Sequence, residues 1–159
     1  MTWIDDLGGV TGSGWTVGGE PSGGRSPHAW RARGADVLRN ARVLVVEDEM
    51  LVAALLEDRL EALGCHVIGP AAAVGDALEL LKTEEIDAAV LDVNLGGEKV
   101  FPVADVLAAR GIPFLFATAY GAAGVADRHN RRDVLDKPYH ERALEHALRS
   151  ALQARGGRH

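Results

Sequence analysis

The segment Ala88-Ala89-Val90-Leu91-Asp92-Val93-Asn94 is a short apolar run that ends in an acid and an amide. Its length suits one buried strand better than a helix. Three other apolar runs also end in polar residues: Val43–Val46 precedes Glu47-Asp48-Glu49, Ile112–Ala117 precedes Thr118, and Val134-Leu135-Asp136 precedes Lys137. Packing does not explain why four strands would each deliver a polar group at the carboxyl end. The pattern therefore predicts a functional site assembled from strand ends.

Strand-like and helix-like segments alternate along the chain from Ala41 onward. The expected strands are Arg42–Val46, His66–Gly69, Ala88–Asp92, Ile112–Ala117 and Asp133–Asp136, and the expected helices cover about residues 49–63, 74–82, 99–110, 122–129 and 140–153. This alternation is typical of parallel strands joined by right-handed crossovers. The nearly continuous apolar strands indicate that both sheet faces are covered. We therefore predict an α/β fold, a doubly wound five-stranded parallel sheet with helices on both faces.

The polar residues at the strand ends suit phosphoryl chemistry. In a doubly wound sheet, ligands bind beyond the carboxyl ends of the strands, where five side chains are expected: Glu47, Asp48, Asp92, Thr118 and Lys137. Clustered carboxylates repel one another unless a cation is bound, and Mg²⁺ prefers such oxygen ligands. A carboxylate can also attack a phosphoryl group, whose oxygens a lysine and a hydroxyl can bind. The set therefore predicts a site for Mg²⁺ and a phosphoryl group.

The composition excludes several classes of protein. The chain has 159 residues, is 47% hydrophobic and 25% charged, and carries a formal net charge of −6. The acidic balance argues against nucleic-acid binding. No apolar run reaches the roughly 20 residues that span a bilayer, and the N-terminus has no secretory signal pattern. A single cysteine, Cys65, excludes an intramolecular disulfide. We therefore expect a cytoplasmic protein without a membrane segment.

Residues 1–40 differ from the rest of the chain because they hold nine of the 19 glycines and show no sustained period. Such a segment buries too little apolar surface to offset its chain entropy, so we expect a disordered glycine-rich extension. A docking motif and a mis-assigned translation start near Val37 are the alternatives. The folded domain is expected to cover residues 41–155.

Four motifs give the chain a family resemblance: Glu47-Asp48-Glu49, Leu91-Asp92, Thr118-Ala119 and Lys137-Pro138. Over residues 41–155 the chain resembles the receiver domain of two-component response regulators. The resemblance implies a flavodoxin-like strand order of 2-1-3-4-5 and a phosphoryl group accepted by Asp92. It also implies Mg²⁺ binding by Asp48, Asp92 and the backbone carbonyl of Asn94, with Glu47 reaching the ion directly or through water. Thr118 and Lys137 would contact the phosphoryl group, and the Lys137–Pro138 peptide would be cis.

A narrower resemblance lies in the segment Pro113–Gly121, which reads PFLFATAYG. It is similar to the "FAT GUY" subgroup of receivers, often single domains from alphaproteobacteria, although Ala119 stands where that motif often has glycine. Because only Arg155–His159 follow the last expected helix, we expect a stand-alone receiver without a DNA-binding output domain. The implied partners are a histidine kinase or a histidine phosphotransfer protein, and a downstream protein target.

The switch that reports phosphorylation is expected to differ from the common one. Most receivers carry an aromatic residue three positions before the site lysine, and this chain has Val134 there. Tyr120, two residues past Thr118, is the expected substitute, and the segment 118–132 is expected to order or shift. A basic cluster nearby is interpreted as a solvated face, with docking of an acidic partner as the alternative; it comprises Arg128, His129, Arg131 and Arg132.

Two rival functions can be weighed against this one. Phosphatases of the haloacid dehalogenase type also phosphorylate an aspartate beside Mg²⁺, but they need a second aspartate two residues on, where this chain has Asn94. They also need room for a cap domain, so the chain is not expected to be an enzyme. A phosphorylation-independent protein-binding module with the same fold is the alternative that stays open, and the complete acid set argues against it.

Overall fold

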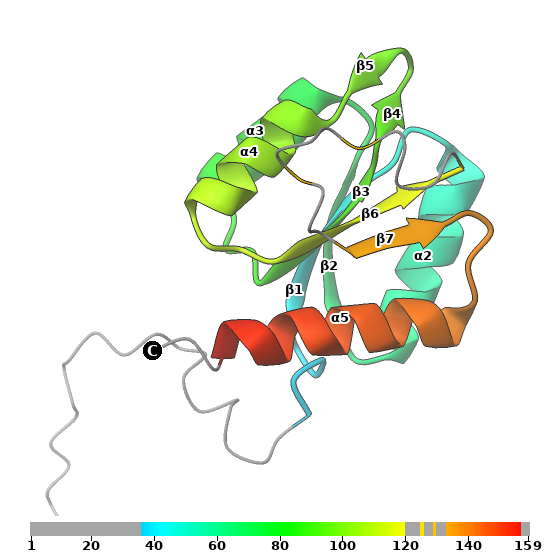
Figure 1. Ribbon diagram of the computed structural model, residues 1–159, viewed down its shortest axis with the longest axis vertical. Coiled ribbons are helices and arrows are strands. Elements are labelled where there is room, and N and C mark those ends of the chain that lie inside the picture. The colour runs from blue at the N-terminus through cyan, green and yellow to red at the C-terminus, as the bar shows by residue number, and fades with distance from the viewer. Residues whose placement is uncertain (1–35, 120–124, 126–128, 130–132, 157–159) are drawn as a thin grey trace, which may run out of the picture. The chain divides into compact units, whose positions relative to one another are not determined.

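A five-stranded parallel sheet forms the centre of the domain in the computed structural model, which describes residues 36–119, 125, 129 and 133–156 (Figure 1). Its strands are β1 (Arg42–Val46), β2 (His66–Ala71), β3 (Ala88–Asp92), β6 (Phe114–Thr118) and β7 (Asp133–Asp136). They lie in the order β2-β1-β3-β6-β7, and every neighbouring pair runs parallel. Counted along the chain within this sheet, the order is 2-1-3-4-5, so the predicted fold is confirmed.

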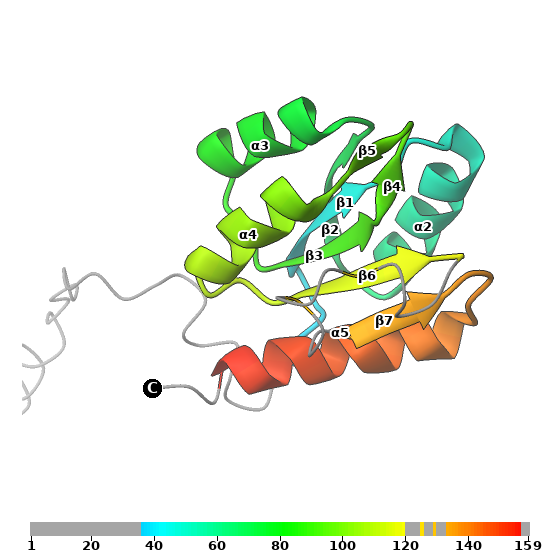
Figure 2. The same cartoon turned by 45° about the horizontal axis from the view of Figure 1, so that its top comes forward.

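Helices cover both faces of this sheet. The described helices are α2 (Met50–Ala62), α3 (Val74–Thr83), α4 (Phe101–Ala109) and α5 (Glu141–Gly156). The helices α3 and α4 pack on one face, and α2 and α5 pack on the other (Figure 2). The first three helices begin without a side-chain cap hydrogen bond. The sequence therefore marks their first residues only weakly. Most of the helix expected over residues 122–129 lies outside the described residues.

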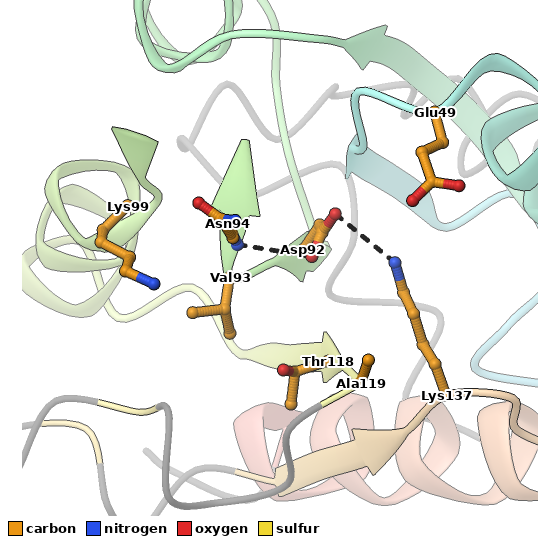
Figure 3. Close-up of a pocket in the computed structure, with 8 residues that line it drawn as sticks. All are labelled: Glu49, Asp92, Val93, Asn94, Lys99, Thr118, Ala119 and Lys137. Carbon is orange, nitrogen blue, oxygen red and sulfur yellow. Dashed lines mark hydrogen bonds and ion pairs between the residues drawn. The ribbon is translucent and has the colours of Figure 1, made fainter. Parts of the chain in front are cut away.

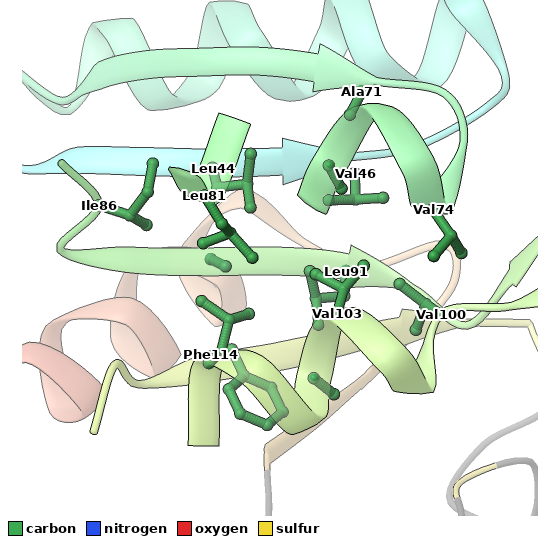
Figure 4. Close-up of a cluster of buried hydrophobic side chains, with 14 of the residues drawn as sticks. Leu44, Val46, Ala71, Val74, Leu81, Ile86, Leu91, Val100, Val103 and Phe114 are labelled. Carbon is green, nitrogen blue, oxygen red and sulfur yellow. The ribbon is translucent and has the colours of Figure 1, made fainter. Parts of the chain in front are cut away.

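Side chains along each strand alternate between two hydrophobic cores, because successive residues of a strand point to opposite faces. On β1, Leu44 and Val46 enter the core beneath α3 and α4 (Figure 4), whereas Val43 and Val45 enter the core beneath α2 and α5. Every residue of β3 is buried. Packing on both faces therefore fixes the strand that ends in Asp92.

A short turn before β1 packs with the domain, although the glycine pattern groups it with the extension. Leu38 is fully buried in the core beneath α2 and α5. The Asp36 carboxylate accepts hydrogen bonds from the Leu38 amide at 3.0 Å and from Arg149 on α5 at 2.6 Å. Near the end of α5, Arg155 donates to the carbonyl of Asp87 at 2.9 Å. These contacts fasten the turn and the end of α5 to the edge of the sheet where β3 begins.

A two-stranded hairpin follows β3 and was not among the predicted elements. Its strands are β4 (Asn94–Leu95) and β5 (Glu98–Lys99), which pair antiparallel around Gly96-Gly97. Both glycines have positive φ, at 59° and 97°. Such angles suit the tightest hairpin loops and favour glycine. The glycine pair therefore turns the chain back on itself before α4.

His129 is buried, so its interpretation as part of a solvated basic face is wrong. Its side chain is 4% exposed, and its Nε2 lies 2.8 Å from Asp105 Oδ1 on α4. Three phenylalanine rings surround it, with centroids 5.6 to 6.1 Å away: Phe101, Phe114 and Phe116. The arginines around it in sequence lie outside the described residues.

Two further findings concern single features of the chain. The Lys137–Pro138 peptide is cis, as the family resemblance implied, and Gly69–Pro70 is cis as well. Among the described residues, no helix is both long enough and apolar enough to cross a membrane.

Candidate functional site

The carboxyl edge of the sheet gathers the side chains that the sequence singled out. Asp92 and Thr118 are the last residues of β3 and β6, and Glu47 and Lys137 directly follow β1 and β7. Because these four strands are neighbours in the order β1-β3-β6-β7, their ends meet at one place. Glu47, Asp92 and Thr118 are all at least nine-tenths buried. The predicted assembly of a site from strand ends is therefore what the fold builds.

Three carboxylates form a compact acidic group at this edge. Oxygen atoms of Glu47, Asp48 and Asp92 all lie within 4.8 Å of one another. Glu47 and Asp92 are buried, whereas Asp48 is half-buried. Hard oxygen ligands from two or three carboxylates are the donor set that Mg²⁺ prefers. The residues present therefore fit a magnesium ion, which Glu47, Asp48 and Asp92 would hold.

Lys137 lies between two of these acids. Its Nζ donates a hydrogen bond of 2.7 Å to Glu47 Oε2 and lies 3.4 Å from Asp92 Oδ2. Burial acts to lower the pKa of this ammonium, but the hydrogen bond to Glu47 and the charge of Asp92 outweigh it, so the net pKa is raised. The backbone amide of Lys137 also donates to the Thr118 carbonyl at 2.8 Å. Lys137 is thus held in its charged form beside the acids.

Asp92 is a carboxylate in an unfavourable place. Burial raises the pKa of its carboxyl group to about 6, the neighbouring Glu47 carboxylate adds to the rise, and the Lys137 ammonium opposes it. The Asn94 backbone amide donates to Asp92 Oδ1 at 3.4 Å. A divalent cation would relieve the repulsion between the acids and favour the ionised, nucleophilic form of Asp92.

An open cavity of about 310 Å³ leads to Asp92 (Figure 3). One lining residue, Lys99 on β5, was missed by the sequence analysis, and Glu49 before α2 was quoted there within the acidic motif but was given no role. The signal that could have found Lys99 is the Gly96-Gly97 pair, because a two-residue glycine loop indicates a hairpin that folds its second strand back toward the site. The full lining is Glu49, Asp92, Val93, Asn94, Lys99, Thr118, Ala119 and Lys137.

The expected switch residue cannot be placed, since Tyr120 lies outside the described residues. Val134, which stands where an aromatic residue is common in receivers, is half-buried on β7 and packs against the core beneath α3 and α4. The role of Tyr120 and the response of segment 118–132 therefore stay predictions.

The chemistry of this arrangement follows from its charges. A carboxylate nucleophile stands at the base of an open cavity, an ammonium and a hydroxyl flank it, and further carboxylates can hold a cation beside it. Transfer of a phosphoryl group needs mainly positioning and neutralisation of charge on its oxygens. These groups supply both.

Known proteins of one family share this sequence pattern and fold. Residues 43–149 match the family model described as the response regulator receiver domain. The chain is 35% identical over 112 residues to the sensory transduction protein LytT of Bacillus anthracis, an alignment that covers 68% of this chain and 46% of LytT. This chain thus spans about half the length of the curated relatives it matches.

Solved structures give the same picture. SdrG from Sphingomonas melonis Fr1 is 48% identical, with a TM-score of 0.64, and the match covers 70% of this chain and 95% of that one. The PhyR receiver domain of Erythrobacter litoralis is 27% identical, with a TM-score of 0.66 and coverage of 72% and 92%. PhyR from Brucella abortus is 26% identical, with a TM-score of 0.64 and coverage of 74% and 50%.

Proposed function

This chain belongs to the response regulator receiver family of two-component systems, and on that premise we propose that Asp92 is its phosphoacceptor. The single observation that carries the proposal is the placement of Asp92, which lies at the base of the open cavity within the acidic group and 3.4 Å from the Lys137 ammonium. The phosphoryl group comes from a histidine kinase or a histidine phosphotransfer protein.

The transfer forms one covalent bond and breaks another. An Asp92 carboxylate oxygen attacks phosphorus, and the bond from phosphorus to the donor nitrogen breaks with its electron pair leaving on the donor imidazole. Lys137 binds a phosphoryl oxygen as a fixed positive charge, and Thr118 donates its hydroxyl to another. Glu47, Asp48 and Asp92, with the Asn94 carbonyl, would hold Mg²⁺, which would neutralise part of the charge on the phosphoryl oxygens. The domain itself turns over no separate substrate.

The surface beside the cavity suits a helical partner. The first turns of α2 expose three large apolar side chains, which we name the α2 patch: Met50 is 85% exposed, Leu51 87% and Leu55 51%. Exposed apolar side chains of this size gathered in one place mark interaction surfaces. Because α2 begins directly after Glu49, which lines the cavity, a kinase or phosphotransfer protein docked there would bring its histidine close to Asp92.

The output of the domain is proposed to be a protein contact. We assign the chain to the FAT GUY subgroup of stand-alone, cytoplasmic receivers, with residues 41–155 and the turn that packs on them at residues 36–40 as the receiver, and the residues before this turn as an extension. A mutant of PhyR from Bartonella quintana is 25% identical to this chain and is called an anti-anti-sigma factor. That name denotes output through another protein.

The test of the proposed function is phosphorylation of the purified protein. Incubation with acetyl phosphate and Mg²⁺ is expected to add one phosphoryl group by intact mass, and the addition should require Mg²⁺ and disappear in Asp92→Ala. The product should decay in alkali, because an acyl phosphate is readily hydrolysed. If neither acetyl phosphate nor a panel of phosphorylated histidine kinases modifies the protein, the chain is a phosphorylation-independent binding module instead.

A further inference from the structure

The β4–β5 hairpin lies beside the acidic group and contributes residues to the cavity lining. At its turn, a side-chain carbon added to Gly96 would lie 3.8 Å from Asp48 Oδ2. In its strands, Asn94 and Lys99 are directly paired. Residues paired across an antiparallel ladder place their side chains on the same face. Asn94 and Lys99 therefore face the cavity together, and both line it.

Lys99 differs from the other lysines of the chain in its surroundings. The sequence has three lysines, Lys82, Lys99 and Lys137. Lys82 pairs with Glu79 at 3.3 Å on α3, and Lys137 is engaged by Glu47 and Asp92. Within the described part of the chain, no acid pairs with Lys99, which is exposed and lines the cavity (Figure 3).

The cavity therefore has one cation on each side of Asp92. Figure 3 shows Lys137 on one side of the carboxylate and Lys99 on the other, beyond Asn94. An incoming phosphoryl donor brings two negative charges to a site that already holds three carboxylates. Before any metal binds, the exposed Lys99 is the cation that such a donor meets first, because the Lys137 side chain is only 18% exposed and is already paired with Glu47.

We propose that Lys99 captures the dianionic phosphoryl group of the donor at the mouth of the cavity, as a second cationic contact opposite Lys137. The ligand class is a phosphoryl group carried on an acyl or an imidazole leaving group. This inference rests on the proposed function and deepens it. Lys99 makes and breaks no covalent bond: Asp92 forms the new oxygen–phosphorus bond, and the leaving group departs with the electron pair of the bond it loses.

The test compares Lys99→Ala and Lys99→Arg with the wild type over a range of acetyl phosphate concentrations at saturating Mg²⁺. Lys82→Ala is the matched control, because it also removes one lysine charge, at the opposite edge of the sheet. We expect Lys99→Ala to lower the second-order rate constant of phosphorylation by about fivefold at low ionic strength, with little change at saturating donor. The difference should shrink as salt is added. Lys99→Arg should restore the rate, and Lys82→Ala should match the wild type.

Two results would overturn the inference. One is an equal second-order rate constant in Lys99→Ala and wild type, which would leave Asp92 as the acceptor untouched. The other is an equal loss in Lys82→Ala, which would mean that only net charge matters. If the wild type takes up no phosphoryl group, the proposed function fails. A titration with beryllium fluoride and Mg²⁺, followed by fluorine NMR, then tests the role of Lys99 separately. Weaker binding of beryllium fluoride by Lys99→Ala than by the wild type supports the capture role. Equal binding by the two proteins, or no binding by either, overturns it.

Discussion

Lys137 lies closer to Glu47 than to Asp92, with its Nζ 2.7 Å from the Glu47 oxygen and 3.4 Å from the nearest Asp92 oxygen. The half-buried ammonium thus makes its shorter contact with the acid that is not the proposed phosphoacceptor. A phosphoryl group on Asp92 would have to draw Lys137 away from Glu47. Binding of Mg²⁺ by Glu47 would assist this, since the ion would replace the ammonium as the partner of that carboxylate.

The raised pKa of Asp92 predicts how stability depends on pH without metal. Its carboxyl has a pKa of about 6 in the folded protein, against an ordinary value of 3.8. Between these values the folded protein holds the proton more tightly than the unfolded chain. Stability should therefore fall as pH rises through this window and remain lower above it. Asp92→Asn should raise the free energy of unfolding at pH 8 by about 2 kcal/mol and flatten this dependence.

Urea unfolding in a metal chelator, from pH 4 to pH 8, measures this effect. Asp58→Asn, which removes an exposed carboxylate on α2, serves as the control and should leave the pH dependence unchanged. A gap between wild type and Asp92→Asn that stays constant over the whole range would show that the Asp92 carboxyl does not titrate in this window.

The acidic group predicts a stabilising effect of Mg²⁺ that depends on Asp48. Because the ion would bind the folded site only, Mg²⁺ at about 100 times its dissociation constant should stabilise the wild type by about 2.7 kcal/mol. Asp48→Asn should lose most of this gain, since a neutral amide replaces one of three carboxylates. Thermal unfolding with increasing Mg²⁺ measures it, with Glu57→Gln on α2 as the control. An undiminished Mg²⁺ effect in Asp48→Asn would exclude this residue as a ligand.

The sheet could be predicted from the sequence because an apolar run followed by a polar residue is a local signal. Arg42–Val46, Ala88–Asp92 and Asp133–Asp136 were predicted to the residue. The β4–β5 hairpin was missed because strands of two residues carry no periodic pattern. His129 was misread because its partner, Asp105, lies 24 residues earlier, and only the packing of α4 on β6 brings the two together. Lys99 was missed together with the hairpin that carries it, although the Gly96-Gly97 pair was a local signal for that turn.

The α2 patch predicts that partner phosphotransfer and small-molecule phosphorylation can be separated. Leu51→Asp should leave folding unchanged, because the side chain is 87% exposed. It should slow phosphotransfer from a phosphorylated kinase or phosphotransfer protein at least tenfold, since a charge would be buried in the apolar contact. Phosphorylation by acetyl phosphate should stay within about twofold of wild type. Gln153→Asp, which places the same charge on an exposed position of α5, should behave as wild type; a similar loss in both would count against docking at α2.

The pair of His129 and Asp105 predicts a structural role for the buried ring. His129→Ala removes a side chain that three phenylalanine rings contact, so the free energy of unfolding should fall by about 3 kcal/mol. Asp105→Asn keeps the shape but weakens the hydrogen bond, and about 1 kcal/mol is expected. Chemical unfolding at constant pH measures both. His146→Ala, at an exposed position of α5, should change stability by less than about 0.5 kcal/mol; a loss as large as that of His129→Ala would mean that burial of the ring is not the cause.

The contacts of Asp36 with Arg149 and of Arg155 with Asp87 have a practical consequence for handling this domain. Both ends of the packed region leave from the edge of the sheet that is farthest from Asp92. A fluorescent protein, an affinity handle or a solid support joined at either end would therefore leave the cavity and the hairpin open to solution. The domain can be fused to a larger assembly at one edge of the sheet while its phosphorylation proceeds at the other.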